Sequence, residues 1–261
     1  MSSLSAGIAG IGFWANGLPG WNDALAFVRD GTLPENPPMK PSPQLLAPNE
    51  RRRAPESVAV ALDVALAACT ASGRDPSKLP SVFASTHGDL AITDYVASTL
   101  ASEPRALSPT KFHNSVHNAA AGYWTIGNGC TAPTTAISAH DASFAQGLLE
   151  ALSLLAAGHE AVLLVAFDAS ATGPLAGVSR SAGLLGGALV LVADPHTAPT
   201  QLRVTPVSTP APAADGALAR RYSGNAMRPM LPLFDALATS GDAAMLHAGP
   251  GRALRVECAH G

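Results

Sequence analysis

The sequence has little cysteine, little charge and no long apolar run. Its cysteines, Cys69, Cys130 and Cys258, form no CxxC pair and no metal-ligand spacing, which argues against a disulfide framework and a metal site. Only 13% of the 261 residues are charged, and a formal net charge of -3 lacks the surplus of Lys and Arg that nucleic acid requires. No apolar run approaches the roughly 20 residues of a membrane span, and the first twelve residues lack the basic start of a secretory signal. We therefore expect a cytoplasmic protein without a membrane span, nucleic-acid partner or cofactor.

What the sequence does contain is an alternation of strands and helices. Hydrophobic residues make up 47% of the chain, enough for a sizeable core, and apolar runs of strand length alternate with helical spacing, which predicts an α/β fold. The expected strands are residues 6–13, 81–85, 133–139, 161–166, 187–193, 202–207 and 253–258. The expected helices are residues 21–28, 55–71, 92–101, 116–126, 141–157 and 232–239, with 116–126 buried. The many prolines of residues 31–56 predict an irregular surface segment.

The most specific motif follows the pattern NxxAGxxxxxxGxxxP. It consists of Asn118, Ala121, Gly122, Gly129 and Pro133. In this pattern the chain resembles the N-terminal half of the β-ketoacyl synthases of the thiolase superfamily. The resemblance implies a single thiolase-like half: layered αβα, with a mixed β-sheet and a buried central helix, and without the C-terminal ketosynthase half. The resemblance covers roughly residues 5–195. We expect residues 1–195 to form the ketosynthase N-terminal-like domain and residues 196–261 to form a divergent C-terminal extension that packs on the same domain.

The resemblance places Asp141 where these enzymes have their nucleophilic cysteine. In the family the cysteine lies eight positions after the proline and seventeen before a glycine, and both Pro133 and Gly158 satisfy this count. Ketosynthases need a thiolate at a helix N-terminus and two histidines from the missing half. A carboxylate attacking a thioester would give a mixed anhydride of higher energy, so no catalytic residue is expected.

Two interpretations of Asp141 remain open. Ser138 and Asp141 have the spacing of a capping box, which predicts a structural role at the start of the helix. Alternatively His140 and Asp141 do some other acid–base work, although neighbouring residues at a helix start are expected to point in different directions. Residues 86–89 are expected to be polar and glycine-containing because they form a turn.

The resemblance also implies a partner. In the family the strand before the nucleophile pairs across a two-fold axis, and the segment corresponding to residues 108–118 reaches toward the partner's acyl pocket. The channel or partner-interface candidates are Lys111, Phe112, Asn118, Thr135, Ile137 and His140.

A chain that keeps these parts without the catalytic ones resembles the chain length factor of type II polyketide synthases, and most closely the small proteins of aryl polyene and xanthomonadin pathways. This implies a heterodimer with a catalytic ketosynthase in polyketide or fatty-acid-like chain elongation, with an acyl carrier protein reached through the complex. Two alternatives are a free-standing thioester hydrolase using His140, Asp141 or His87, and a scaffold that binds carrier proteins through the basic run Arg51–Arg53.

Overall fold

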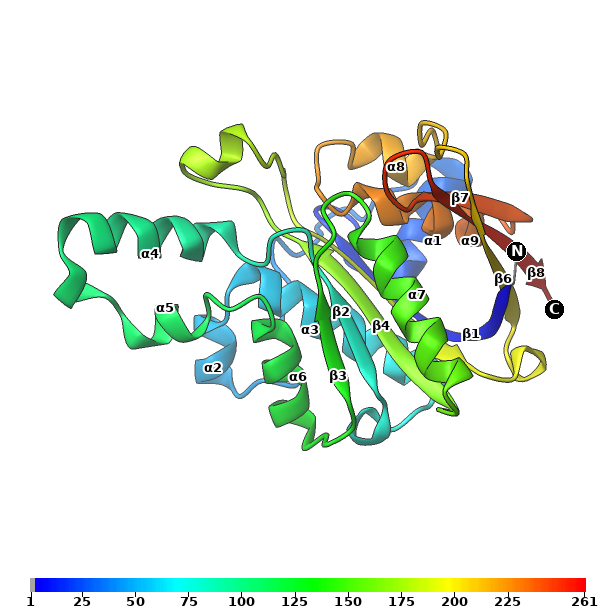
Figure 1. Ribbon diagram of the computed structural model, residues 1–261, viewed down its shortest axis with the longest axis horizontal. Coiled ribbons are helices and arrows are strands. Elements are labelled where there is room, and N and C mark those ends of the chain that lie inside the picture. Colours follow the sequence, from blue (N-terminus) through cyan, green and yellow to red (C-terminus); the bar gives the residue numbers. More distant parts are fainter. Residues whose placement is uncertain (1–2) are drawn as a thin grey trace.

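The computed structural model describes residues 3–261 and contains one sheet of eight strands in the order β3-β2-β4-β5-β1-β6-β8-β7 (Figure 1). The strands are β1 Leu4–Ala15, β2 Ser81–Ala84, β3 Thr134–Ile137, β4 Ala161–Asp168, β5 Leu185–Val192, β6 Thr200–Val207, β7 Ala243–His247 and β8 Ala253–His260. Strands β2, β3 and β4 are parallel to one another, and the remaining pairs are antiparallel, so the sheet is mixed.

Helices cover both faces of this sheet, as the predicted αβα layering requires. They are α1 Trp21–Asp30, α2 Pro48–Arg53, α3 Glu56–Ser72, α4 Leu90–Ser102, α5 Pro109–His113, α6 Ala119–Asn128, α7 Ser143–Ala156, α8 Ala217–Arg221 and α9 Leu231–Ala238. Helices α3 and α6 form one apolar cluster with the sheet, and α1, α7, α8 and α9 form the cluster on the other face. All eight residues of β4 and of β5 are buried, since both faces of these central strands are covered. The fold is therefore a single thiolase-like half, as predicted.

The buried helix of this fold is α3. Ten of its 17 residues are buried, and it lies so close to β1 that a Cβ on Gly12 would sit 2.0 Å from the Val64 carbonyl oxygen. Gly12 and Gly10, whose added Cβ would overlap the Ala68 carbonyl oxygen, therefore admit the α3 backbone next to β1.

Helix α6 differs from the prediction. It begins at Ala119 rather than residue 116 and buries only one side, with Val116 and Ile126 51% and 82% exposed. The prediction of a buried helix at residues 116–126 was wrong because the apolar residues of this segment are distributed around the helix rather than along one stripe.

Four short elements were not predicted from the sequence. Helix α2 lies inside the proline-rich segment that was expected to be irregular, α5 lies between two expected helices, and α8 and β7 lie in the last part of the chain. Each is five or six residues long, which is too short for a periodic apolar pattern to develop.

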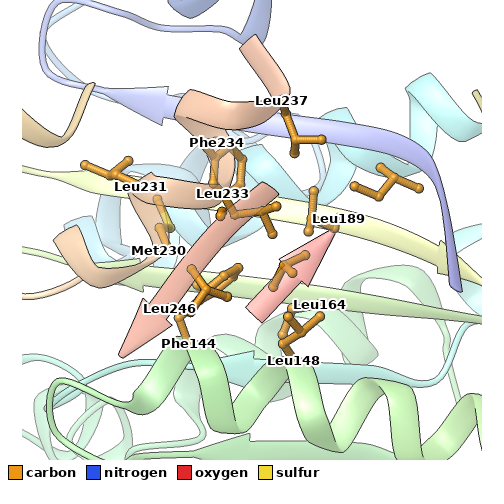
Figure 2. Packing of buried hydrophobic residues seen from close by; sticks show 14 of the residues in the cluster. Phe144, Leu148, Leu164, Leu189, Met230, Leu231, Leu233, Phe234, Leu237 and Leu246 are labelled. Carbon is orange, nitrogen blue, oxygen red and sulfur yellow. The ribbon is translucent and has the colours of Figure 1, made fainter. Parts of the chain in front are cut away.

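The C-terminal residues continue the sheet. Strand β6 pairs with β1, β8 pairs with β6, and β7 forms the far edge. Phe234 of α9 contacts the rings of Phe13, Trp21 and Phe144 at centroid distances of 5.7, 5.9 and 6.4 Å. Figure 2 shows side chains from α9, α7, β4, β5 and β7 gathered in this cluster. The sheet continues from β5 through β1 to β6 without a break, so it contains no marker of a domain boundary at residue 195. The division of the chain at that residue stays a prediction.

Helices α4 and α5 lie outside the layers that cover the sheet. Figure 1 shows them projecting from one side of the molecule, away from the sheet. Of the thirteen residues of α4 only Leu90 and Ile92, at its beginning, are buried, and α5 has no buried residue. We call residues 90–113, which include both helices, the arm. No helix within residues 3–261 is long and apolar enough to span a bilayer.

Candidate functional site

The parallel strands β2, β3 and β4 end at the same edge of the sheet, and polar residues follow each of them. The Ser85 amide donates to the Ile137 carbonyl over 3.1 Å, which continues the β2–β3 pairing into the loops. The Ser138 hydroxyl donates to the Thr86 carbonyl over 2.8 Å. Ligand and catalytic groups commonly gather at the carboxyl ends of strands in α/β sheets, so this edge is the candidate site.

A buried carboxylate holds the β2 and β4 ends together. Asp168, the last residue of β4, is 0% exposed and accepts hydrogen bonds from the Ser85 hydroxyl at 2.7 Å and from the Thr86 amide at 3.1 Å. Its Oδ1 lies 3.7 Å from Nδ1 of His87, within ion-pair distance when the imidazole is protonated. Burial raises the pKa of Asp168, against the opposing effects of His87 and of the donors Ser85 and Thr86.

The sequence interpretation missed Asp168. Its only signal is a single acid that ends an apolar run of strand length, and nothing in the sequence indicates that the acid faces inward. His87 was expected to belong to a turn and, in the alternative of a thioester hydrolase, to be a candidate catalytic residue; the turn is present, with Gly88 at φ +66°. Its imidazole is nevertheless only 10% exposed, and Nε2 has no hydrogen-bond partner within residues 3–261. The turn therefore carries a buried acid–base pair.

Asp141 is placed differently from the capping-box prediction. Helix α7 begins at Ser143, and no side chain caps it, so the predicted box is wrong. His140 has φ +52°, and this turn delays the helix by two residues and leaves Asp141 before its first turn. The Ser143 hydroxyl accepts from the Ala139 amide at 2.9 Å and donates to the His140 carbonyl at 2.6 Å. Ser138 meanwhile donates to β2's loop, so it is not available as a cap.

His140 and Asp141 contact each other, contrary to the expectation that they diverge. Their Nδ1 and Oδ1 atoms lie 3.3 Å apart, and the side chains are 74% and 59% exposed. The positive φ at His140 places the two side chains on the same side of the turn. An ion pair this exposed contributes at most about 1 kcal/mol and is screened by salt.

The thiols of the chain lie elsewhere. Cys69, Cys130 and Cys258 are all free and buried, in α3, after α6 and in β8. Burial raises the pKa of Cys69 to about 12 and that of Cys258 to about 11, so both stay protonated at neutral pH. None of the three thiols belongs to the loop after β3, which contains the Asp141 carboxylate. Within residues 3–261, no three His, Cys, Asp or Glu side chains are placed to share a metal ion.

The six interface candidates lie in three places. Thr135 and Ile137 lie on β3, which has no neighbour on its outer side within the described sheet, and His140 follows in the adjoining loop. Lys111 and Phe112 lie on α5, where Phe112 is 59% exposed and the Lys111 ammonium sits 3.8 Å from the ring centroid of Tyr95. Asn118 is exposed at the start of α6 and makes no side-chain cap bond.

The comparisons with known proteins agree with this geometry. The model of the family described as "Beta-ketoacyl synthase, N-terminal domain" matches residues 27–239, and the chain belongs to this family. The match reaches past residue 195, where the resemblance noted in the sequence ends. No protein of curated function matches the sequence closely enough to count as a relative.

Solved structures of similar shape include ketosynthases and ketosynthase complexes. A chain of the ketosynthase (ApeO) in complex with its chain length factor (ApeC) from Xenorhabdus doucetiae is 23% identical, with a TM-score of 0.76 over 97% of this chain and 99% of that one. A chain of the ishigamide ketosynthase/chain length factor gives 14% identity and 0.72 over 98% and 99%. A β-ketoacyl synthase from Burkholderia phymatum STM815 gives 12% identity and 0.59 over 92% of this chain and 71% of that one.

A third complex includes a carrier protein. It is AntDE:AntF, described as a type II polyketide synthase acyl-carrier protein in complex with its ketosynthase bound to the hexaketide. The match has 13% identity and a TM-score of 0.74, over 99% of this chain and 100% of that one. At these identities the likeness is one of fold.

Proposed function

We propose that this chain is a non-catalytic subunit, of the chain-length-factor kind, that pairs with an active ketosynthase in type II polyketide chain elongation. The observation that carries the proposal is the loop after β3, where the exposed Asp141 carboxylate stands next to His140 and to which none of the three cysteines belongs. A carboxylate cannot store an acyl group as a thioester does, so the acyl chain must reside on the partner's cysteine.

The pairing surface in this proposal is the outer edge of β3. Its four residues are at least partly exposed, whereas all four residues of β2 next to it are buried. An edge strand offers unpaired N–H and C=O groups for another strand, so a partner's strand can extend the sheet here. Thr135 and Ile137 would lie directly in that contact.

The arm is proposed to shape the partner's product channel. Phe112 and Leu100 are apolar side chains with 59% and 51% exposure, far from the core of their own chain. Exposed apolar groups on a projecting segment are typical of an interaction surface. A channel shaped by apolar side chains suits an apolar growing chain such as an extended polyene. We therefore propose aryl polyene formation as the pathway.

The test is co-expression with the catalytic ketosynthase and purification through a tag on one subunit, followed by condensation of malonyl-carrier protein. We expect a stable heterodimer whose activity requires the partner's cysteine and is unchanged by Asp141→Ala. Phe112→Ala should shift the product-length distribution, and Ile126→Ala, which removes an 82% exposed side chain from α6, is the matched control. Failure to associate would contradict the proposal.

An independent thioester-processing enzyme is the second candidate, and the His87–Asp168 pair is the observation that favours it. A buried acid 3.7 Å from an imidazole whose Nε2 has no hydrogen-bond partner within residues 3–261 is an arrangement that suits a general base. This candidate predicts thioester turnover by the purified chain alone, abolished by His87→Ala. Turnover without the ketosynthase would favour it over the non-catalytic subunit.

A further inference from the structure

The buried part of the arm lies where it joins the rest of the molecule. Within residues 90–113 the buried side chains are Leu90 and Ile92, both at the beginning of α4. Farther along α4, Asp94 lies against Gly173, but that glycine belongs to an exposed loop after β4. We call residues 85–89, which lead into α4, and residues 114–117, which follow α5, the base of the arm. The direction of the arm therefore depends on its base.

The two helices of the arm are tied to each other. The hydroxyl of Tyr95 in α4 accepts a hydrogen bond from the Ser108 amide, just before α5, at 3.1 Å. The Lys111 ammonium of α5 lies 3.8 Å from the centroid of the same tyrosine ring. Because α4 and α5 are joined in this way, a change at the base moves both helices together.

A histidine links the two parts of the base. Nε2 of His117 lies 3.0 Å from the Ser85 carbonyl oxygen, which can only accept, so this nitrogen carries a proton. Gly88 lies against the same histidine, because a Cβ added to it would be 3.6 Å from both Cα and Cδ2 of His117. The hydrogen bond thus joins the turn that enters α4 to the segment that leaves α5.

The acceptor of this hydrogen bond is fixed in the core. Ser85 is 0% exposed, its amide donates to the Ile137 carbonyl at 3.1 Å, and its hydroxyl donates to Asp168 at 2.7 Å. Asn114, the other anchored residue of the base, accepts from the Tyr123 hydroxyl of α6 instead. Within residues 3–261, no second hydrogen bond joins residues 114–117 to residues 85–89. Without the His117 donor, packing alone would hold the two parts of the base together.

We propose that His117 is a positioning residue whose hydrogen bond to Ser85 fixes the direction of the arm. The consequence for the product rests on the proposed function, in which Phe112 of the arm shapes the partner's channel. Helix α4 has 13 residues and is about 20 Å long, so a change of direction by about 15° moves its far end by about 5 Å. A displacement of that size at the arm changes the channel, so His117 sets the product length through the arm.

The direction of the arm can be measured on the purified full-length chain without a partner. Spin labels on Ser102→Cys, at the exposed end of α4, and on Ser153→Cys, exposed on α7, report one distance by double electron–electron resonance. The native cysteines are buried and stay unlabelled in the folded chain. His117→Phe keeps a ring against Gly88 but removes the donor, so it should broaden the distance distribution or shift it by about 5 Å. His117→Gln keeps a donor and should retain the wild-type distribution.

The same variants are then compared in the complex with the catalytic ketosynthase, with products separated by mass spectrometry. His117→Phe should shift the product-length distribution, and His117→Gln should leave it unchanged. His196→Phe, which makes the same change at an exposed histidine between β5 and β6, is the matched control in both measurements. His117→Asn, whose amide is one carbon further from Ser85, takes the place of His117→Phe if circular dichroism shows that the phenylalanine variant does not fold.

The two measurements separate the possible failures. A distance distribution that His117→Phe or its replacement leaves unchanged, or a change that His117→Gln shows as well, would overturn the proposal. A changed distance with an unchanged product length would refute the link to the product and, with it, the role of the arm in the proposed function. A change in both measurements that only the variants without the donor show supports the proposal.

Discussion

Replacing Asp168 with alanine should destabilise the candidate site more than any exposed substitution near it. The substitution leaves the Ser85 hydroxyl and the Thr86 amide without their acceptor and removes the group facing His87. Breaking a buried pair of this kind costs about 3–5 kcal/mol, because the orphaned donors stay buried. We expect a loss of that size in the free energy of unfolding.

Guanidinium titration followed by circular dichroism and by the fluorescence of the buried Trp14 and Trp124 measures this loss. Asp168→Asn keeps the shape and one acceptor oxygen, so it should lose about 1–3 kcal/mol. Asp141→Ala, an exposed acid in the next loop, is the matched control and should change stability by less than about 0.5 kcal/mol. A loss below about 1 kcal/mol for Asp168→Ala would refute the reasoning.

The pH dependence of the same proteins gives a second measure. Because burial raises the pKa of Asp168, the folded chain keeps a proton that the unfolded chain releases near pH 4. The contribution of Asp168 to stability therefore falls as pH rises from about 4 toward the raised pKa. The stability difference between the wild type and Asp168→Asn should decrease over that interval, and an increase would contradict the sign.

Three further predictions concern the core. Phe234→Ala should cost about 3–5 kcal/mol in a denaturant titration, because it empties the ring cluster of α9; a loss under about 1 kcal/mol would place α9 outside the core. Gly12→Ala should prevent soluble folding because its Cβ would overlap the α3 backbone, whereas Gly122→Ala, with open space around it, should be tolerated in an expression comparison. Cys69 and Cys258 should resist thiol reagents at pH 8 until unfolding, and prompt native labelling seen by mass spectrometry would contradict their burial.

The longer elements could be predicted from the sequence because their signals are local. The helix at residues 56–72 and the strands at residues 161–168 and 185–192 are apolar over most of their length. Elements that are buried this extensively must be apolar whatever they pack against, so their composition predicts them. The family pattern around Asn118 and Pro133 likewise placed β3 before a helix. These elements can be predicted without knowing which segments of the chain contact one another.

Contacts between distant segments were decided only by the tertiary structure. Asp168 and Ser85 are 83 positions apart, and only the parallel pairing of β2 and β4 brings their side chains to 2.7 Å. The start of α7 depends on the Ser138 bond to the β2 loop and on the turn at His140, neither of which a capping pattern can show. The buried Asn114 side chain accepts a hydrogen bond only because α6 brings the Tyr123 hydroxyl to 3.1 Å from its amide oxygen. Sequence periodicity records which side chains are buried, whereas the partner that each buried polar group finds depends on how the elements pack together.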